Sequence, residues 1–195
     1  MADPIVPKIL AFAGSLRRGS WNKMLVRAAA TAAAGAGADV HIADLRDFPL
    51  PIFDEDLERE NGTPTEATAL KKLFVAADGL LIASPEYNSS ISAALKNAID
   101  WVSRPAPGEA PLVAFTGKTA AILATSPGGL GGLRGLVHLR SILGSIGVLV
   151  LPEQTAIPKA HEAFASDGSI KDAKTAAGVA AIGRRLAELT ASLKR

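Results

Sequence analysis

The sequence predicts an α/β fold in which helices cover both faces of one parallel β-sheet. Short apolar runs alternate along the chain with longer segments whose apolar residues recur at helical spacing, and this alternation favours parallel strands joined by helices. The chain has 195 residues, of which 48% are hydrophobic and 21% charged, as in globular proteins. We therefore expect one domain over residues 1–195 and exclude a disordered, collagen-like or coiled-coil chain.

Five runs have the composition of strands. The first, residues 8–13, is apolar and stops at Gly14, and the second, residues 38–43, alternates between apolar and polar side chains. We expect Pro152 to end the last run, because proline cannot donate a hydrogen bond to a neighbouring strand. The three remaining runs are residues 79–83, 119–124 and 147–151.

Five further segments are expected to form helices. Their apolar residues fall on one stripe, as Ile91, Leu95 and Val102 do in the clearest of them. Residues 47–60, which hold two prolines and many acids, are expected to form a long surface loop. The expected helices are residues 22–34, 65–77, 90–102, 132–143 and a C-terminal helix with Val179, Ile182, Leu186, Leu189 and Leu193 on one face.

Five parallel strands favour a doubly wound sheet, and the flavodoxin-like strand order 2-1-3-4-5 is the better match for that number. Such sheets bind ligands beyond the carboxyl ends of their strands, at the point where the strand order reverses. In this order the reversal lies between strands 1 and 3. We therefore expect the loops after strands 1, 3 and 4 to carry the chemistry.

The loop after the first strand, residues 14–22, has the chemistry of a phosphate site. Ser15, Ser20 and Asn22 offer short hydrogen-bonding side chains, and Arg17 offers a charge-assisted fork. The helix that follows adds unpaired N–H groups and the positive end of its dipole. The alternative is an ordinary helix cap beside a solvated basic loop. The chain contains neither a Walker motif nor Gly-x-Gly-x-x-Gly, which argues against a Rossmann dehydrogenase.

The other two loops suit a flat ligand. Residues 84–90 contain the only tyrosine of the chain, and Asn88 or Ser89 is expected to cap the following helix. Residues 125–135 contain five glycines, which permit a ligand to approach the backbone closely. A capped turn and a flexible loop are the alternatives. Together the three loops favour a mononucleotide with a planar ring, such as FMN, without excluding another nucleotide.

Four motifs resemble those of the NADPH-dependent FMN reductase family, a flavodoxin-like group that includes bacterial quinone and chromate reductases. The resemblance runs from Ile9 to about Val150, and it departs at Ser92-Ala93, where many relatives have Pro-Gly. The motifs are Gly-Ser-Leu-Arg-x-x-Ser-x-Asn at 14–22, Pro-Leu-Pro-Ile-Phe-Asp-Glu-Asp-Leu at 49–57, Pro-Glu-Tyr-Asn-x-Ser at 85–90 continuing into 95–101, and Ser-Pro-Gly-Gly-x-Gly-Gly-x-Arg at 126–134.

The resemblance implies a role for each matching residue toward FMN. Arg104 matches a position expected to contact substrate or a neighbouring subunit, with a surface salt bridge as the alternative. The alternative for Glu86 is an ion pair across a subunit interface. The residues implied to contact FMN are Ser15, Arg17, Ser20 and Asn22 at the phosphate, Pro85, Glu86, Tyr87 and Asn88 at the ribityl chain and ring, and Ser126, Gly128 and Gly129 at the pyrimidine edge.

The resemblance also implies the activity. NADPH, or NADH, would donate a hydride to the flavin, and quinones, free flavin, chromate or azo compounds would accept the electrons, with no catalytic residue of the protein. A homodimer or homotetramer with the flavin near the interface is implied, and if helix 90–102 pairs across a two-fold axis, its outer residues would contribute together with Asp100 and Arg104. A flavodoxin-type electron carrier and a regulatory flavin-binding protein without NADPH turnover are the alternatives, although flavodoxins are usually acidic and this chain has a net charge of +2.

Composition excludes several other classes of function. The absence of cysteine excludes disulfides, thiolate metal sites and iron–sulfur clusters, and it fits a reducing compartment. The small net charge gives no reason to expect nucleic acid, and no apolar run approaches the ~20 residues of a membrane span. His41, His138 and His161 are scattered, so no metal site is expected, and residues 1–7 do not resemble a secretory signal. A cytoplasmic protein is expected.

Overall fold

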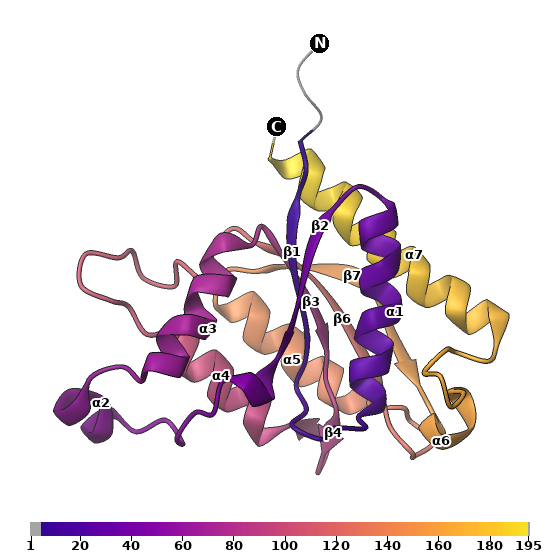
Figure 1. Ribbon diagram of the computed structural model, residues 1–195, viewed down its shortest axis with the longest axis horizontal. Helices are drawn as coiled ribbons and strands as arrows, with labels where there is room; N and C mark the ends of the chain where they lie inside the picture. Colours follow the sequence, from indigo (N-terminus) through magenta and orange to yellow (C-terminus); the bar gives the residue numbers. More distant parts are fainter. Residues whose placement is uncertain (1–4, 195) are drawn as a thin grey trace.

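A five-stranded parallel sheet forms the centre of the molecule in the computed structural model, which describes residues 5–194 (Figure 1). The strand order is β2-β1-β3-β6-β7, which confirms the predicted order 2-1-3-4-5, because a short hairpin takes the labels β4 and β5. The five strands are β1 Lys8–Ala13, β2 Asp39–Asp44, β3 Gly79–Ala83, β6 Thr119–Thr125 and β7 Leu149–Ile157. All four pairings between them are parallel.

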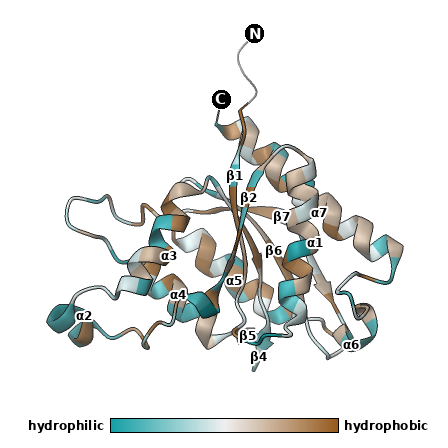
Figure 2. Cartoon of the chain, viewed as in Figure 1, coloured by the Kyte–Doolittle hydropathy of each residue, from teal (hydrophilic) through white to brown (hydrophobic). Residues whose placement is uncertain are grey.

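Helices cover both faces of the sheet and divide the core in two. Alternate residues of β3 point to opposite faces, so Leu80 and Ile82 join one apolar cluster while Leu81 joins the other. Figure 2 shows the strongly apolar centre of the sheet. The first cluster lies under α3 Thr65–Ala76, α4 Ala93–Ser103 and α5 Leu133–Ser145, and the second under α1 Trp21–Gly35 and α7 Ala173–Leu193. A single helical turn, α6 Ala160–Ala163, follows β7.

The last strand is longer than predicted. The prediction that Pro152 ends the strand is wrong, because β7 continues through Pro152 to Ile157. β7 is an edge strand, where the missing N–H of a proline is tolerated. The pairing with β6 also shifts register between Ala120 and Ile122, and this irregularity absorbs the extra residues beside Pro152.

The acidic segment is not all loop. Residues 45–47 form a 3-10 turn, η1 Leu45–Asp47, and the expected loop contains a short helix, α2 Glu55–Asn61. The Asp54 carboxylate caps α2 by accepting hydrogen bonds from the N–H groups of Asp56 and Leu57. Acidic residues in the first turn of α2 also complement the helix dipole, so the acids that suggested a loop in fact favour a helix start.

A β-hairpin replaces the start of the helix predicted at 90–102. Strand β4 Glu86–Tyr87 pairs antiparallel with β5 Ser90–Ile91, and the two turn residues between them have positive φ angles of 51° and 67°. Those turn residues, Asn88 and Ser89, therefore do not cap α4. The cap is Ser92, whose hydroxyl accepts a hydrogen bond from the Leu95 N–H at 3.1 Å.

Within residues 5–194, none of the helices is long and apolar enough to cross a membrane.

The contact between α1 and α7 yields a matched pair of substitutions. A Cβ atom added at Gly183 would lie 2.1 Å from the Ala29 carbonyl oxygen, whereas one added at the exposed Gly178 of the same helix would meet nothing within 4 Å. Gly183→Ala is therefore expected to lower the free energy of unfolding by about 1–3 kcal/mol. Gly178→Ala is expected to raise it by about 0.5–1 kcal/mol, because alanine favours a helix over glycine. Urea titrations measure both, and equal effects of the two substitutions would contradict this packing.

Candidate active site

The three predicted loops meet in one pocket at the carboxyl edge of the sheet. Its volume is about 250 Å³, and the loops after β1, β3 and β6 all contribute to its wall. Eight of the residues singled out from the sequence line this pocket: Ser15, Arg17, Ser20, Asn22, Pro85, Glu86, Tyr87 and Ser126. Three lining residues, Trp21, Thr125 and Pro127, lie within the predicted loops but were not predicted to contact the ligand.

The start of α1 brings hydrogen-bond donors and a cation to the pocket. Ser20 is the N-cap of α1, yet its hydroxyl makes no capping hydrogen bond and is free to face the pocket. The Arg17 guanidinium donates to the Gly19 carbonyl oxygen at 2.8 Å and lies over the Trp21 ring, 5.0 Å from its centroid. A cation, a hydroxyl and the N–H groups of the first helical turn are donors of the kind that an anion binds.

The Asn22 side chain joins the first loop to the third. Its Nδ2 donates to the Thr125 carbonyl oxygen at 2.9 Å, and its Oδ1 accepts from the Thr125 N–H at 3.0 Å. Both residues are buried, so water cannot replace these bonds easily. The amide of Asn22 therefore fixes the start of α1 against the end of β6, a positioning contact that the sequence did not predict.

The hairpin is held against α5 by Glu86. One oxygen of the Glu86 carboxylate accepts from Arg134, with a shortest distance of 2.6 Å, and the other accepts from the Gly135 N–H at 3.1 Å. Burial raises the pKa of this carboxyl, but the hydrogen bonds from Gly135 and Arg134 outweigh burial and hold the pKa below its usual value. The ion pair considered for Glu86 is thus made within the chain, to Arg134.

Two glycines of the third loop are required by the fold. Gly131 and Gly132 have φ angles of 64° and 94°, and a Cβ at Gly131 would lie 2.6 Å from the backbone of Ile157. Gly128 and Gly129 have open space around their Cα atoms and do not line the pocket. The sequence could not separate these two roles, because all four glycines lie in one run.

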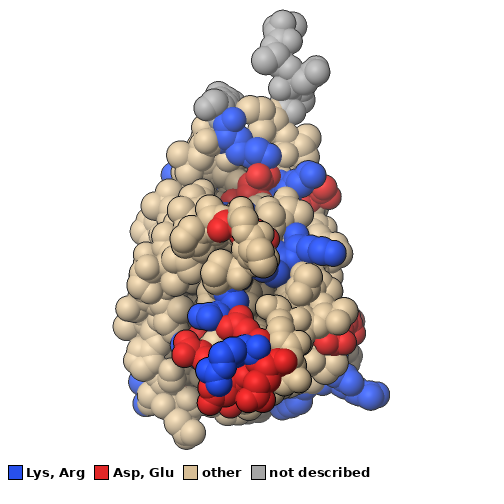
Figure 3. Space-filling model, turned by 90° about the vertical axis from the view of Figure 1, so that its left-hand side faces the viewer, with Lys and Arg blue, Asp and Glu red and all other residues tan. Residues whose placement is uncertain are grey.

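Arg104 lies apart from this pocket. Its Nε donates to both oxygens of the Glu58 carboxylate, at 3.1 and 2.8 Å, and its guanidinium lies 5.2 Å from the centre of the Phe53 ring. The side-chain hydrogen bond that Arg104 donates to Glu58 raises the pKa of Arg104 above its usual value. Figure 3 shows acidic and basic side chains intermixed on this side of the molecule. The geometry of Arg104 matches the surface salt bridge that was the alternative to a contact with substrate or a neighbouring subunit.

Asn88 is not among the residues that line the pocket.

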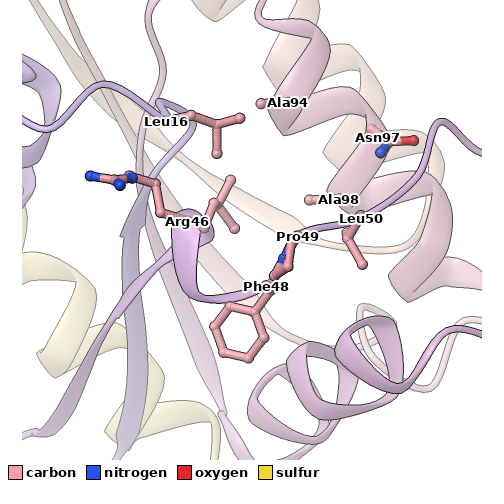
Figure 4. A pocket seen from close by; sticks show the side chains of 9 residues that line it. Leu16, Arg46, Phe48, Pro49, Leu50, Ala94, Asn97 and Ala98 are labelled. Atoms are coloured by element: carbon pink, nitrogen blue, oxygen red, sulfur yellow. The ribbon is translucent and has the colours of Figure 1, made fainter.

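A second cavity lies at the loop of residues 14–17, where Leu16 forms part of its wall (Figure 4). It measures about 340 Å³ and is mostly apolar. Ser15 and Arg17 line the first pocket, while Leu16 between them lines the second. The second cavity is formed by Leu16, Leu45, Arg46, Phe48, Pro49, Leu50, Ala94, Asn97 and Ala98.

Among residues 5–194, no group of three His, Asp or Glu side chains is placed to bind a metal ion.

Solved structures show that this fold belongs to flavin oxidoreductases. The chain is similar to FerB, a flavoenzyme NAD(P)H:(acceptor) oxidoreductase from Paracoccus denitrificans, with a TM-score of 0.79 and 32% sequence identity. The match covers 95% of this chain and 97% of that one. The sheet order is flavodoxin-like, and the likeness to FerB connects this fold with flavin oxidoreductases.

The chain belongs to the NADPH-dependent FMN reductase family, whose model matches residues 7–162. An NAD(P)H-dependent FMN reductase of Pseudomonas aeruginosa is 39% identical over 175 residues, which make up 89% of each chain. A quinone reductase of Escherichia coli K12 is 38% identical over 147 residues, 74% of this chain and 73% of the relative. These findings confirm the family, the oxidoreductase class, and FMN with NAD(P)H as cofactor and co-substrate.

The pairing of Asn22 with Thr125 gives a stability prediction. Asn22→Ala leaves the buried N–H and C=O groups of Thr125 without partners, so we expect the free energy of unfolding to fall by about 2–4 kcal/mol. Asn61→Ala is the control, because Asn61 is exposed and makes one long hydrogen bond on α2, and it should cost less than about 0.5 kcal/mol. Chemical denaturation measures both, and equal costs would contradict the role of Asn22.

The lowered pKa of Glu86 gives a pH prediction. A carboxyl whose pKa is lower in the folded state contributes stability above its unfolded pKa, about 4.3, and loses that contribution as pH falls through the folded pKa. We expect Glu86→Gln to destabilise the protein most at neutral pH and progressively less below about pH 4. Glu60→Gln, at an exposed position of α2, is the control. Denaturation from pH 3 to pH 7 tests this, and a pH-independent difference from wild type would contradict it.

Proposed function

We propose that this protein transfers electrons from NAD(P)H to quinones through FMN bound in the pocket of about 250 Å³. The observation that carries the proposal is the meeting of an anion site, an exposed aromatic side chain and a glycine-rich loop at one sheet edge. The quinone reductase of E. coli supports quinones as acceptors. Free flavin, azo compounds and chromate are further electron acceptors in the proposal. The cytoplasm is the proposed location of the protein.

The residues at the pocket fit FMN. The free hydroxyl of Ser20, the cation of Arg17 and the first turn of α1 are suitable donors for a doubly charged phosphate. Tyr87 is 58% exposed at the hairpin and offers a ring beside a flat ligand. In the proposal, Ser15, Arg17 and Ser20 hold the phosphate while Asn22 positions the start of α1, Pro85, Glu86 and Tyr87 lie along the ribityl chain and ring, and Ser126 meets the pyrimidine edge. Asn88, Gly128 and Gly129 do not line the pocket, and their contacts with FMN stay predictions.

The protein orients ligands and supplies no nucleophile. When bound, FMN supplies two-electron redox chemistry between NAD(P)H and the acceptor. Arg17 is already held by Gly19 and Trp21, so little side-chain freedom is lost when a phosphate binds to it. Glu86 acts through the hairpin, because its carboxylate is occupied by Arg134 and Gly135 and keeps Tyr87 at the pocket.

We also propose a homo-oligomer, either a dimer or a tetramer. The expected face of α4 is largely occupied within the chain, since Asp100 pairs with Lys96 at 2.7 Å and Arg104 with Glu58. Leu130, Leu133 and Val137, at and before the start of α5, are 43–59% exposed and offer a better apolar contact. Sedimentation velocity tests the proposal, and a monomer at micromolar concentration would overturn it.

The proposed reaction is tested by visible spectroscopy. The protein loaded with FMN should show the flavin absorption band and lose it when NADPH is added without oxygen. Restoration of the band by a quinone completes the test. A retained band that NADPH does not bleach would indicate a flavodoxin-type carrier or a regulatory flavoprotein. Failure to retain FMN would overturn the proposed site.

The phosphate site is tested by Arg17→Ala. Loss of a charge-assisted hydrogen bond should raise the Kd for FMN by roughly tenfold or more. Arg18→Ala is a matched control, because the neighbouring Arg18 is exposed and does not line the pocket. Its Kd should stay within about twofold of wild type. Fluorescence titration of the flavin-free protein measures both constants, and equal constants for the two variants would contradict the assignment of Arg17.

A further inference from the structure

The wall of the second cavity is fixed before any ligand binds. The Asn97 side chain donates to the Pro51 carbonyl oxygen and accepts from the Phe53 N–H, both at 2.8 Å. The Trp101 indole N–H donates to the same Pro51 oxygen at 2.8 Å, and its ring packs edge-on against Phe53. These bonds hold residues 48–53 against α4. The cavity is therefore preformed, and the amide of Asn97 is already occupied by backbone groups.

The chemistry of the cavity is apolar with a single cation at its edge. Ala94 and Ala98 lie one turn apart on α4 and leave room for a flat group opposite Leu16 (Figure 4). In this view the Arg46 guanidinium is directed away from these alanines. Arg46 is the one charged residue in the lining.

Arg46 is available for a ligand. The adjacent acid Asp44 is neutralised by Lys23, whose Nζ lies 2.6 Å from its carboxylate, and Asp44 also accepts from the backbone N–H of Arg46. Among residues 5–194, no ion pair uses the guanidinium of Arg46. An exposed arginine beside a neutralised acid is suited to bind a phosphate.

The position of the cavity indicates which substrate uses it. The nicotinamide ring and the electron acceptor must both reach the flavin ring, so both belong to the first pocket. A dinucleotide has a second half, an adenosine, that needs a separate site nearby. Leu16 lines the second cavity while its neighbours Ser15 and Arg17 line the first, so the two lie at the same loop, whereas a simple quinone has no group that requires a second cavity.

We propose that the second cavity binds the adenosine half of NADPH and that the Arg46 guanidinium binds its 2′-phosphate. Arg46 is then the residue that selects NADPH over NADH, which differs only by lacking this phosphate. This inference rests on the proposed function, because it assigns the binding site of the co-substrate in that reaction. Its test measures binding without turnover, so this inference and the proposed function can each fail independently of the other.

The experiment compares two fragments by calorimetry on the FMN-loaded protein. Adenosine 2′,5′-bisphosphate should bind at least tenfold more tightly than 5′-AMP, the ratio expected for one charge-assisted contact. Arg46→Ala should abolish this ratio by weakening only the bisphosphate. Ala94→Leu, which fills the cavity from the half-buried face of α4, should weaken both fragments. Arg27→Ala removes an exposed charge on α1 and should change neither.

Kinetics provide the second measurement. Arg46→Ala should raise the KM for NADPH roughly tenfold and reduce the preference for NADPH over NADH by the same factor. A ratio of fragment affinities that Arg46→Ala leaves intact would overturn the proposal, as would bisphosphate binding unaffected by Ala94→Leu. If Ala94→Leu impairs quinones but not the fragments, the cavity belongs to the acceptor and the proposal is wrong.

Discussion

The pairing of the Asn22 amide with both backbone groups of Thr125 is the contact on which the pocket depends. It connects residues 103 positions apart in the sequence and fixes the start of α1 against the end of β6. The donors of α1 that we propose for the phosphate and the loop at Ser126 are thereby held in one arrangement. A polar side chain achieves this because both Thr125 groups are buried and would otherwise lack partners.

Two further contacts complete this arrangement around the loop after β3. The Ser92 hydroxyl caps α4 and also donates to the Gly14 carbonyl oxygen at 2.5 Å, so the first loop is joined to α4. Glu86 joins the hairpin to α5. The departure from Pro-Gly at Ser92-Ala93 therefore has a positive role here, because a hydroxyl makes two hydrogen bonds that a proline cannot make. A preformed pocket of this kind loses little entropy when a ligand binds.

Charge is distributed for anionic ligands although the whole chain carries only +2. Arg17 lies at the first pocket and Arg46 at the second, on either side of the loop at residues 14–17. Two of the nearby acids are paired with other cations, Asp44 with Lys23 and Glu86 with Arg134. Net charge therefore gives little information about this site, and the local pairing of acids determines its character.

Periodicity in the sequence was sufficient to predict the five strands, because each depends on a local pattern of apolar residues. Their order and the sheet edge that carries the pocket followed from the preferred topology of doubly wound sheets. Only the tertiary structure decided that β7 passes through Pro152, since an edge position is what makes that proline acceptable. It also decided the partners of Asn22, Glu86 and Arg104. Polar side chains that pair across distant segments leave no local pattern, so their roles depend on which segments the folded sheet brings together.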